Sequence, residues 1–404
     1  MSKINFETAG EQTRAIHAGE TPEAGVKSSA PDIVMSTTFL ADPNTGFSAE
    51  AQDENTAWVY TRWGNPTIHQ LEEKLAVLEQ GETAVAFASG MGAITALLFH
   101  TLKAGDHLLI SDVTYAALTE MVNEYIPKLN IEVTKVDTSD LELVRRAVQP
   151  NTKLIYIETP CNPLLRLTDI EAVAQIARSA DAKLAVDSTF ATPLATRPLS
   201  LGADFVIHSL TKYLGGHGDA LGGAIIGSNA NLAALRKKTA LRLGGILSPF
   251  NAWLIMRGLA TFPIRMRAHE ENALKVAVFL EQHPKIKRVL YPGLPSHPQY
   301  KLAKRQMRNF SGMITFQIEN GAAKVSPFAE SLNLIHYAVS LGHHRTLVFY
   351  LGSKDLLETT FHFDTAAQKE SWNRFAGEGL FRLSVGLEDA NDVIADLAQA
   401  LEKI

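Results

Sequence analysis

The stretch Ser209-Leu210-Thr211-Lys212-Tyr213 is the strongest chemical signal in this chain. It follows the apolar run 205–208, so we expect the lysine at the carboxyl end of a buried strand, where open α/β sheets bind ligands. A lysine held in a partly dry site can lose its proton and attack an aldehyde. The hydroxyls of Ser209 and Thr211 can hold a phosphate beside it. Taken alone, a motif this short is more often ordinary surface.

Asp187 follows an earlier apolar run, 184–186, and enough chain for one helix and one further strand separates it from Lys212. Both side chains can therefore emerge at the same edge of the sheet. A carboxylate that faces a pyridine nitrogen keeps that nitrogen protonated, which makes the ring an electron sink for carbanions. An isolated aspartate after a strand is more often a helix cap or a turn residue.

Two further features point to the same edge. Gly90 and Met91 lie in a glycine-containing turn between a strand and an apolar helix, where exposed amides form a phosphate cradle. Tyr115 follows the next strand and can stack on an aromatic ring, although a tyrosine packed at the rim is the alternative. The stretch from Glu158 to Asn162 closes the strand after that. This combination of phosphate turn, aromatic ring, carboxylate and lysine predicts pyridoxal phosphate as the cofactor.

The pattern of apolar runs predicts the elements that position these residues. Short runs bounded by turn residues indicate seven strands, and amphipathic stretches at 67–80 and 170–179 indicate helices between them. This alternation predicts an α/β fold with a mostly parallel seven-stranded sheet. The seven predicted strands are 84–88, 107–111, 132–136, 154–158, 184–186, 205–208 and 222–227.

We expect three parts along the chain: an N-terminal arm at 1–60, a large cofactor-binding domain at 61–260, and a smaller α+β domain at 261–404. The arm is rich in turn and polar residues and has little core of its own; such arms often reach a partner subunit. The last part combines a long helical pattern, two strand-like runs and a closing helix, at 265–282, 313–318, 381–385 and 391–401.

The composition excludes several classes of protein. Of 404 residues, 46% are hydrophobic and 20% charged, which is typical of a globular protein with a large core. A net charge of -5 gives no basic field for nucleic acid or an anionic membrane, so a small molecule is the expected partner. Cys161 is the only cysteine, and no Cys/His cluster has the spacing of metal ligands. With no apolar segment near the start and no run of about 18 apolar residues, we expect a cytoplasmic location.

Five motifs make the chain resemble, over nearly its whole length, the cystathionine γ-synthase-like family of pyridoxal-phosphate enzymes of Cys/Met metabolism. Within that family it looks most similar to the methionine γ-lyases. The resemblance implies the fold called type I among pyridoxal-phosphate enzymes. The motifs are Tyr60-Thr-Arg62-Trp-Gly-Asn-Pro-Thr, Ala88-Ser-Gly90-Met91, Asp187-Ser-Thr-Phe, Ser209-Leu-Thr211-Lys212-Tyr and Arg382-Leu-Ser-Val-Gly-Leu-Glu-Asp.

The resemblance implies a role in cofactor binding for each matching residue. Lys212 would hold pyridoxal phosphate as a Schiff base and later carry protons, and Asp187 would pair with the ring nitrogen. Tyr115 would stack on the ring and assist proton transfer, while Asn162 would contact the ring oxygen. The phosphate would be held by Gly90, Met91, Ser209 and Thr211.

The resemblance also implies a shared site and a substrate clamp. Tyr60 and Arg62 would complete the phosphate cradle of a neighbouring subunit, so the site would need a dimer, expected to pair into a tetramer. Arg382, together with Ser340, would bind the α-carboxylate of an amino-acid substrate. An arginine considered alone is more often part of a surface ion pair.

Two departures from the family bear on the substrate. Methionine γ-lyases carry a cysteine shortly after the stacking tyrosine, but Tyr115 is followed by two alanines. The stretch His343-His344-Arg345 stands where many relatives have small or acidic residues, and these side chains can contact a polar or anionic substrate tail. A solvated loop with no substrate contact explains so short a cluster at least equally well.

These features predict a γ-lyase that acts on a γ-substituted L-amino acid, either methionine- or homocysteine-like or oxygen-linked, as in canavanine or an O-acylhomoserine. γ-Replacement on an O-acylhomoserine and β- or γ-elimination of cystathionine stay open. A catalytically silent cofactor-binding protein is the alternative from another class.

Overall fold

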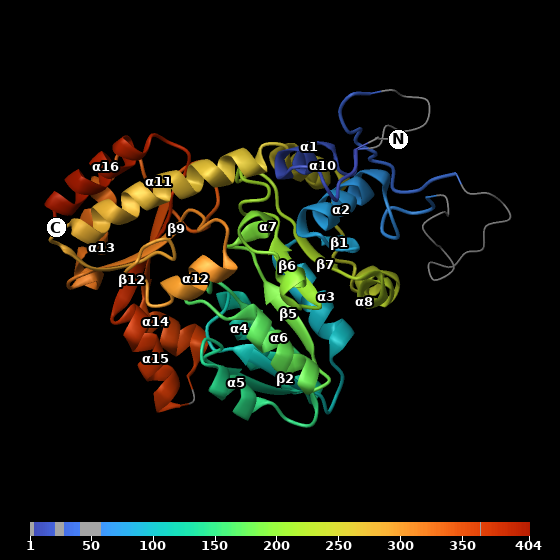
Figure 1. Ribbon diagram of the computed structural model, residues 1–404, viewed down its shortest axis with the longest axis horizontal. Helices are drawn as coiled ribbons and strands as arrows, with labels where there is room; N and C mark the ends of the chain where they lie inside the picture. The colour runs from blue at the N-terminus through green and yellow to red at the C-terminus, as the bar shows by residue number, and fades with distance from the viewer. Residues whose placement is uncertain (1–3, 21–27, 41–57, 364) are drawn as a thin grey trace.

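The computed structural model describes residues 4–20, 28–40, 58–363 and 365–404, and these residues form two sheets with helices around them (Figure 1). The larger sheet has seven strands in the order β1-β7-β6-β5-β4-β2-β3, and the smaller has five in the order β10-β11-β12-β9-β8. The residues 1–3, 21–27 and 41–57 of the predicted arm lie outside the described residues. The predicted α/β class, with a seven-stranded sheet and a second smaller one, is confirmed.

The larger sheet consists mostly of parallel strands. β6, β5, β4, β2 and β3 run parallel to one another, whereas β7 is antiparallel to both β1 and β6. The central strands β4, β5 and β6 are buried over nearly their whole length because helices cover both faces of the sheet. The bounds are β1 Thr83–Phe87, β2 His107–Ser111, β3 Glu132–Val136, β4 Thr152–Glu158, β5 Lys183–Asp187, β6 Phe205–Ser209 and β7 Gly223–Gly227, each within two residues of the predicted strand.

Several of the helices between the strands begin at a residue whose side chain caps the helix. The Asn65 side chain accepts from the Thr67 amide at 2.9 Å, with Pro66 as first residue of the helix. Asp169 caps a later helix through the Ala172 amide. The helices of this part are α2 Pro66–Glu79, α3 Gly90–Thr101, α4 Ala116–Glu124, α5 Leu141–Ala147, α6 Ile170–Ser179, α7 Thr192–Ala195, α8 Asn229–Ala234, α9 Leu241–Leu243 and α10 Pro249–Leu259.

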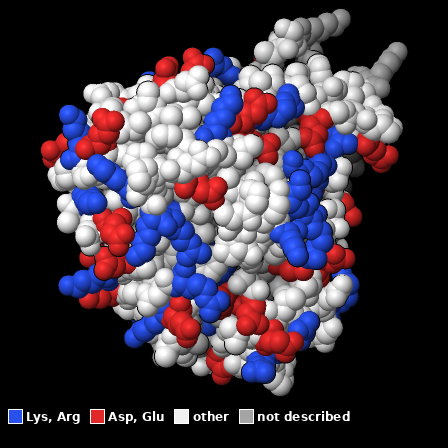
Figure 2. Space-filling view, turned by 60° about the vertical axis from the view of Figure 1, so that its left-hand side comes forward, with Lys and Arg blue, Asp and Glu red and all other residues white. Residues whose placement is uncertain are grey.

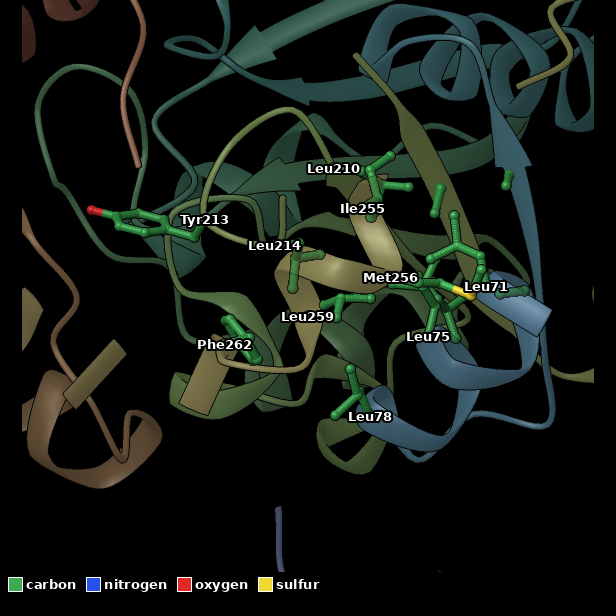
Figure 3. Packing of buried hydrophobic residues seen from close by; sticks show 14 of the residues in the cluster. Leu71, Leu75, Leu78, Leu210, Tyr213, Leu214, Ile255, Met256, Leu259 and Phe262 are labelled. Atoms are coloured by element: carbon green, nitrogen blue, oxygen red, sulfur yellow. The ribbon is translucent and has the colours of Figure 1, made fainter. Parts of the chain in front are cut away.

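The segment that carries Lys212 is anchored in the hydrophobic core. Figure 3 shows its neighbours Leu210 and Leu214 packed among buried side chains of α2 and α10. Arg265 adds a hydrogen bond to the Tyr213 carbonyl at 2.8 Å. Because the residues on both sides of Lys212 are buried, the lysine is held at a defined position at the end of β6.

The smaller sheet lies beside the larger one, and the long helix α11 Phe262–Gln282 runs from the region of α1 and α10 towards it (Figure 1). Its strands are β8 Ile286–Leu290, β9 Met313–Ile318, β10 His336–Tyr337, β11 Leu347–Gly352 and β12 Gly379–Ser384, antiparallel except for the β10–β11 pair. Its helices are α12 Tyr300–Gln306, α13 Gly321–Ser331, α14 Ser353–Leu356, α15 Ala366–Ala376 and α16 Ala390–Glu402.

The described part of the arm is not wholly extended. Residues Glu11–His17 form helix α1, whose Ala15 joins the hydrophobic core beside α2. Thr38 and Tyr60 form an isolated antiparallel bridge. The division of the chain at residues 60 and 260 stays a prediction.

Candidate active site

Lys212 lies three residues beyond the end of β6, and its Nζ donates a hydrogen bond to Ser340 Oγ at 3.0 Å. Burial lowers the pKa of Lys212 to about 8, and the nearby charge of Arg382 acts in the same direction. A larger fraction of this amine is therefore neutral at neutral pH than for an ordinary lysine. A neutral amine is both a nucleophile for an aldehyde and a base for a carbon-bound proton.

An anion cradle is present at the N-terminus of α3. The Ser89 hydroxyl caps this helix by accepting from the Gly92 amide at 3.0 Å. A Cβ built on Gly90 would lie only 3.1 Å from Ser209 Cβ, so glycine allows the two strand ends to meet. Within the described ranges, the amides of Gly90 and Met91 and the Ser209 hydroxyl make no hydrogen bond. These donors suit a phosphate.

The Thr211 hydroxyl is placed differently from that of Ser209. It accepts from the Gly222 amide at 3.1 Å and contacts the Gly222 carbonyl at 3.3 Å, so it ties the two chain segments together. A bound phosphate would have to compete with the carbonyl for its proton. The assignment of Thr211 to the phosphate stays a prediction.

Asp187 is the last residue of β5 and is buried. One carboxylate oxygen accepts from the Thr189 amide at 3.0 Å, and the other accepts from the Tyr156 hydroxyl at 3.2 Å. Burial raises the pKa of Asp187, while the bonds from Thr189 and the nearby His208 oppose that rise. A cationic ring nitrogen opposite the carboxylate would relieve the cost of the buried charge.

Glu158, the last residue of β4, joins two parts of the site. One carboxylate oxygen accepts from the Tyr115 amide and the other from the Asn162 amide, both at 2.7 Å. Burial, followed by the charge of Asp187, raises the pKa of Glu158 well above its usual range. Glu158 had no predicted role in binding or catalysis. Its only signal in the sequence is a carboxylate at the end of the apolar run 154–157.

Arg382 of β12 is a side chain from the smaller sheet that contacts this site. Its guanidinium donates to Asn162 Oδ1 at 2.9 Å and to the Ser340 carbonyl at 3.2 Å. Burial lowers the pKa of Arg382 to about 10. Arg382, Asn162, Ser340 and Lys212 therefore form one connected group.

Tyr60 and Arg62 have contacts other than those of the connected group around Lys212. The Arg62 guanidinium donates to the Leu241 carbonyl at 2.9 Å and lies 5.5 Å from the centre of the Tyr60 ring. In the described part of the chain, neither residue makes a hydrogen bond to the other predicted site residues. Their action on a neighbouring subunit's phosphate site stays a prediction.

The residues at this edge fit pyridoxal phosphate. Gly90, Met91 and Ser209 offer unused donors for the phosphate, Asp187 offers a carboxylate for the ring nitrogen, and Tyr115 offers a 45% exposed ring. Lys212 offers an amine that could react with the aldehyde.

The profile described as Cys/Met metabolism PLP-dependent enzyme matches residues 12–402. The chain belongs to this family. It is 43% identical over 397 residues to the L-methionine γ-lyase of Fusobacterium nucleatum subsp. polymorphum, covering 97% of this chain and 98% of that one. It is 40% identical over 405 residues to the canavanine γ-lyase of Rhizobium leguminosarum bv. trifolii, covering 99% and 98%.

A solved structure agrees with these sequence comparisons. The cystathionine γ-lyase from Lactobacillus plantarum, in complex with L-serine, matches this member of the family with a TM-score of 0.87 and 35% identity, covering 98% of this chain and 99% of that one. A small amino-acid substrate is consistent with the family. No helix among the described residues is long and apolar enough to cross a membrane.

Proposed function

We propose that this protein is a pyridoxal-phosphate-dependent γ-lyase that removes the γ-substituent of an L-amino acid. The substrate is methionine- or homocysteine-like, or oxygen-linked as in canavanine or an O-acylhomoserine. The observation that carries the proposal is the contact of Lys212 with Ser340, whose carbonyl binds Arg382. A partly neutral amine thus lies beside a guanidinium that can bind an α-carboxylate.

The chain's own residues prepare the substrate for elimination. Arg382 binds the α-carboxylate by a charge-assisted pair, which orients the α-proton towards Lys212. Lys212 accepts the α-proton, gives that proton up, and then accepts a β-proton. Bound pyridoxal phosphate supplies the electron sink that acidifies both protons and lets the γ-group leave. Asp187 stabilises the charge on the ring nitrogen, and Tyr115 covers the ring.

A panel of substrates tests this proposal and its specificity. We expect polar-tailed substrates to exceed methionine in kcat/KM, because Tyr115 is followed by alanines and His343 lies at the site, with its Nε2 3.3 Å from Ser340 Oγ. A polar group left unpaired by an apolar tail costs about 1–3 kcal/mol, or on the order of tenfold or more in specificity. The panel is methionine, homocysteine, cystathionine, O-acylhomoserines and canavanine.

Separate measurement of 2-oxobutyrate, pyruvate and homoserine distinguishes the reaction types. A tenfold lead for methionine would defeat the specificity prediction and leave the γ-lyase intact. Pyruvate as the main product would defeat both.

The proposal includes a cytoplasmic homo-oligomer, a dimer with shared sites that pairs into a tetramer. The support is that, among the described residues, Tyr60 and Arg62 make no hydrogen bond to the site group of their own chain, whereas Arg62 donates to the Leu241 carbonyl. The net charge of -5 and the mixture of basic and acidic side chains on the face in Figure 2 favour a small-molecule partner over a polyanion.

Mixing two inactive variants tests the shared site. Arg62→Ala subunits combined with Lys212→Ala subunits should regain part of the activity, because each heterodimer has one site with neither change. The matched control combines Asp187→Asn with Lys212→Ala, two residues placed in the same chain's site, and should regain none. Absence of recovery in the first mixture, despite confirmed subunit exchange, would place Arg62 in its own chain's site or outside any site.

A further inference from the structure

A chain of hydrogen bonds leads away from Lys212. The Lys212 amine donates to Ser340 Oγ at 3.0 Å, and the same oxygen lies 3.3 Å from His343 Nε2. Because Ser340 accepts from the lysine, its own proton remains for the imidazole. This pattern assigns His343 Nε2 as the acceptor and places the ring proton on Nδ1.

The His343 ring is held between the site and an exposed loop. A Cβ built on Gly218 would lie 2.5 Å from His343 Cε1 and 2.7 Å from Nδ1, so the ring packs directly on the backbone of this glycine. His217, Gly218 and Asp219 are exposed, whereas His343 is half-buried. One ring nitrogen therefore faces Ser340, and the other lies against a loop that contacts solvent.

We propose that His343 passes protons between Lys212 and solvent through the Ser340 hydroxyl. The inference rests on the proposed function, in which Lys212 accepts protons from the substrate. The Ser340 oxygen takes a proton from the Lys212 ammonium as it gives its own to His343 Nε2. The imidazolium then releases the Nδ1 proton to water, so the lysine becomes neutral and the serine is unchanged. His343 acts on the substrate only through other residues, which makes it a positioning residue.

The charges around His343 suit such a transfer. Burial, followed by the charge of Lys212, lowers the pKa of His343, so the imidazole is a neutral acceptor at neutral pH. The pKa of Lys212, lowered to about 8, means that its ammonium must lose a proton in each turnover below that pH. The other charged or titratable groups that affect these two residues are His344 and Arg345, which lower the pKa of His343, Asp219, which raises it, and Arg382 beside the lysine.

Exchange of the α-hydrogen separates proton transfer from the loss of a leaving group. L-Alanine has no γ-substituent, and its α-hydrogen is followed by proton NMR in D2O with the holoenzyme. His343→Leu removes the acceptor, whereas His343→Gln keeps an oxygen acceptor that cannot pass a proton. Both should slow exchange on the order of tenfold, less than the roughly 10²–10⁴-fold of a group that transfers a proton directly to or from the substrate, because His343 acts only through Ser340 and Lys212. Added imidazole should restore part of the rate in His343→Leu, and the control His336→Gln, at an exposed histidine of β10, should match the wild type.

The same comparison defines what overturns the inference. Full exchange in His343→Gln together with slow exchange in His343→Leu would show that the imidazole only orients Ser340. Wild-type exchange in both variants would remove any role for His343. A wild-type enzyme with no exchange would defeat the proposed function as well.

A second readout does not depend on activity. In the cofactor-free protein, the NMR titration of His343 should move to higher pH in Lys212→Ala, because removal of the lysine charge takes away a cause that lowers the histidine's pKa. An unchanged titration would show that the two residues are not coupled and would overturn the inference.

Discussion

Replacing Lys212 with alanine should abolish both the elimination reaction and the visible absorption of the bound cofactor, while the chain stays folded. The expected loss of kcat is on the order of 10⁴-fold, the upper end for one acid–base group, because this residue is also the nucleophile. Folding should persist because the core contacts come from Leu210, Tyr213 and Leu214, whereas among the described residues the amine bonds only to Ser340. Absorption spectra, steady-state rates and thermal unfolding measure the three effects.

Lys183→Ala is the matched control for this result. Lys183 is an exposed lysine at the opposite end of the sheet's strands, paired with Asp204 at 2.7 Å, and its loss should leave colour and activity unchanged. A cofactor that borohydride still fixes to another lysine in Lys212→Ala would contradict the assignment.

Replacing Asp187 with asparagine should lower kcat by about 10²–10³-fold, the usual cost of removing one preorganised electrostatic partner. The carboxylate is buried and already held by Thr189 and Tyr156, so its charge is fixed in position before the cofactor binds. An amide of the same shape leaves the ring nitrogen without its anion and weakens the electron sink. Steady-state kinetics measure the loss, and a pH titration of the absorption spectrum reports the ring's protonation.

Tyr156→Phe separates the charge of Asp187 from its hydrogen bonds. The substitution removes the 3.2 Å bond but leaves the carboxylate, so its effect on kcat should be much smaller than that of Asp187→Asn. Equal losses in the two variants would mean that orientation, and not charge, is what Asp187 contributes. Wild-type kinetics in Asp187→Asn would remove this residue from the site.

The strands of the larger sheet are predictable because their signals are local. Buried parallel strands are largely apolar on both faces, so runs such as 107–111 and 154–158 stand out and fall in β2 and β4. The strands of the smaller sheet are harder to predict from the sequence. β11 was not predicted although its residues are apolar, and β10 has two residues, too few for a period to show.

The sequence by itself determined that the chemical groups lie at one edge of the larger sheet, because each follows a strand and parallel strands present their carboxyl ends at the same edge. Lys212, Asp187, Tyr115 and the Gly90 turn were all placed on this basis. Only the tertiary structure decided which side chains touch. Arg382 meets Asn162, and Lys212 meets Ser340, through the packing of the smaller sheet against the larger.

For the same reason, the contacts of Glu158, Thr211 and His343 could not be predicted from the sequence. A strand-end position shows where a side chain begins but not which distant donor it meets, so the two amides on Glu158 and the Gly222 contacts of Thr211 had no sequence signal. His343 was noticed as a departure from the family, but its contact with Ser340 depends on a loop that packs against Gly218. Strand positions follow from local periodicity, whereas hydrogen bonds need atoms placed to within about half an ångström, which only the packed core supplies.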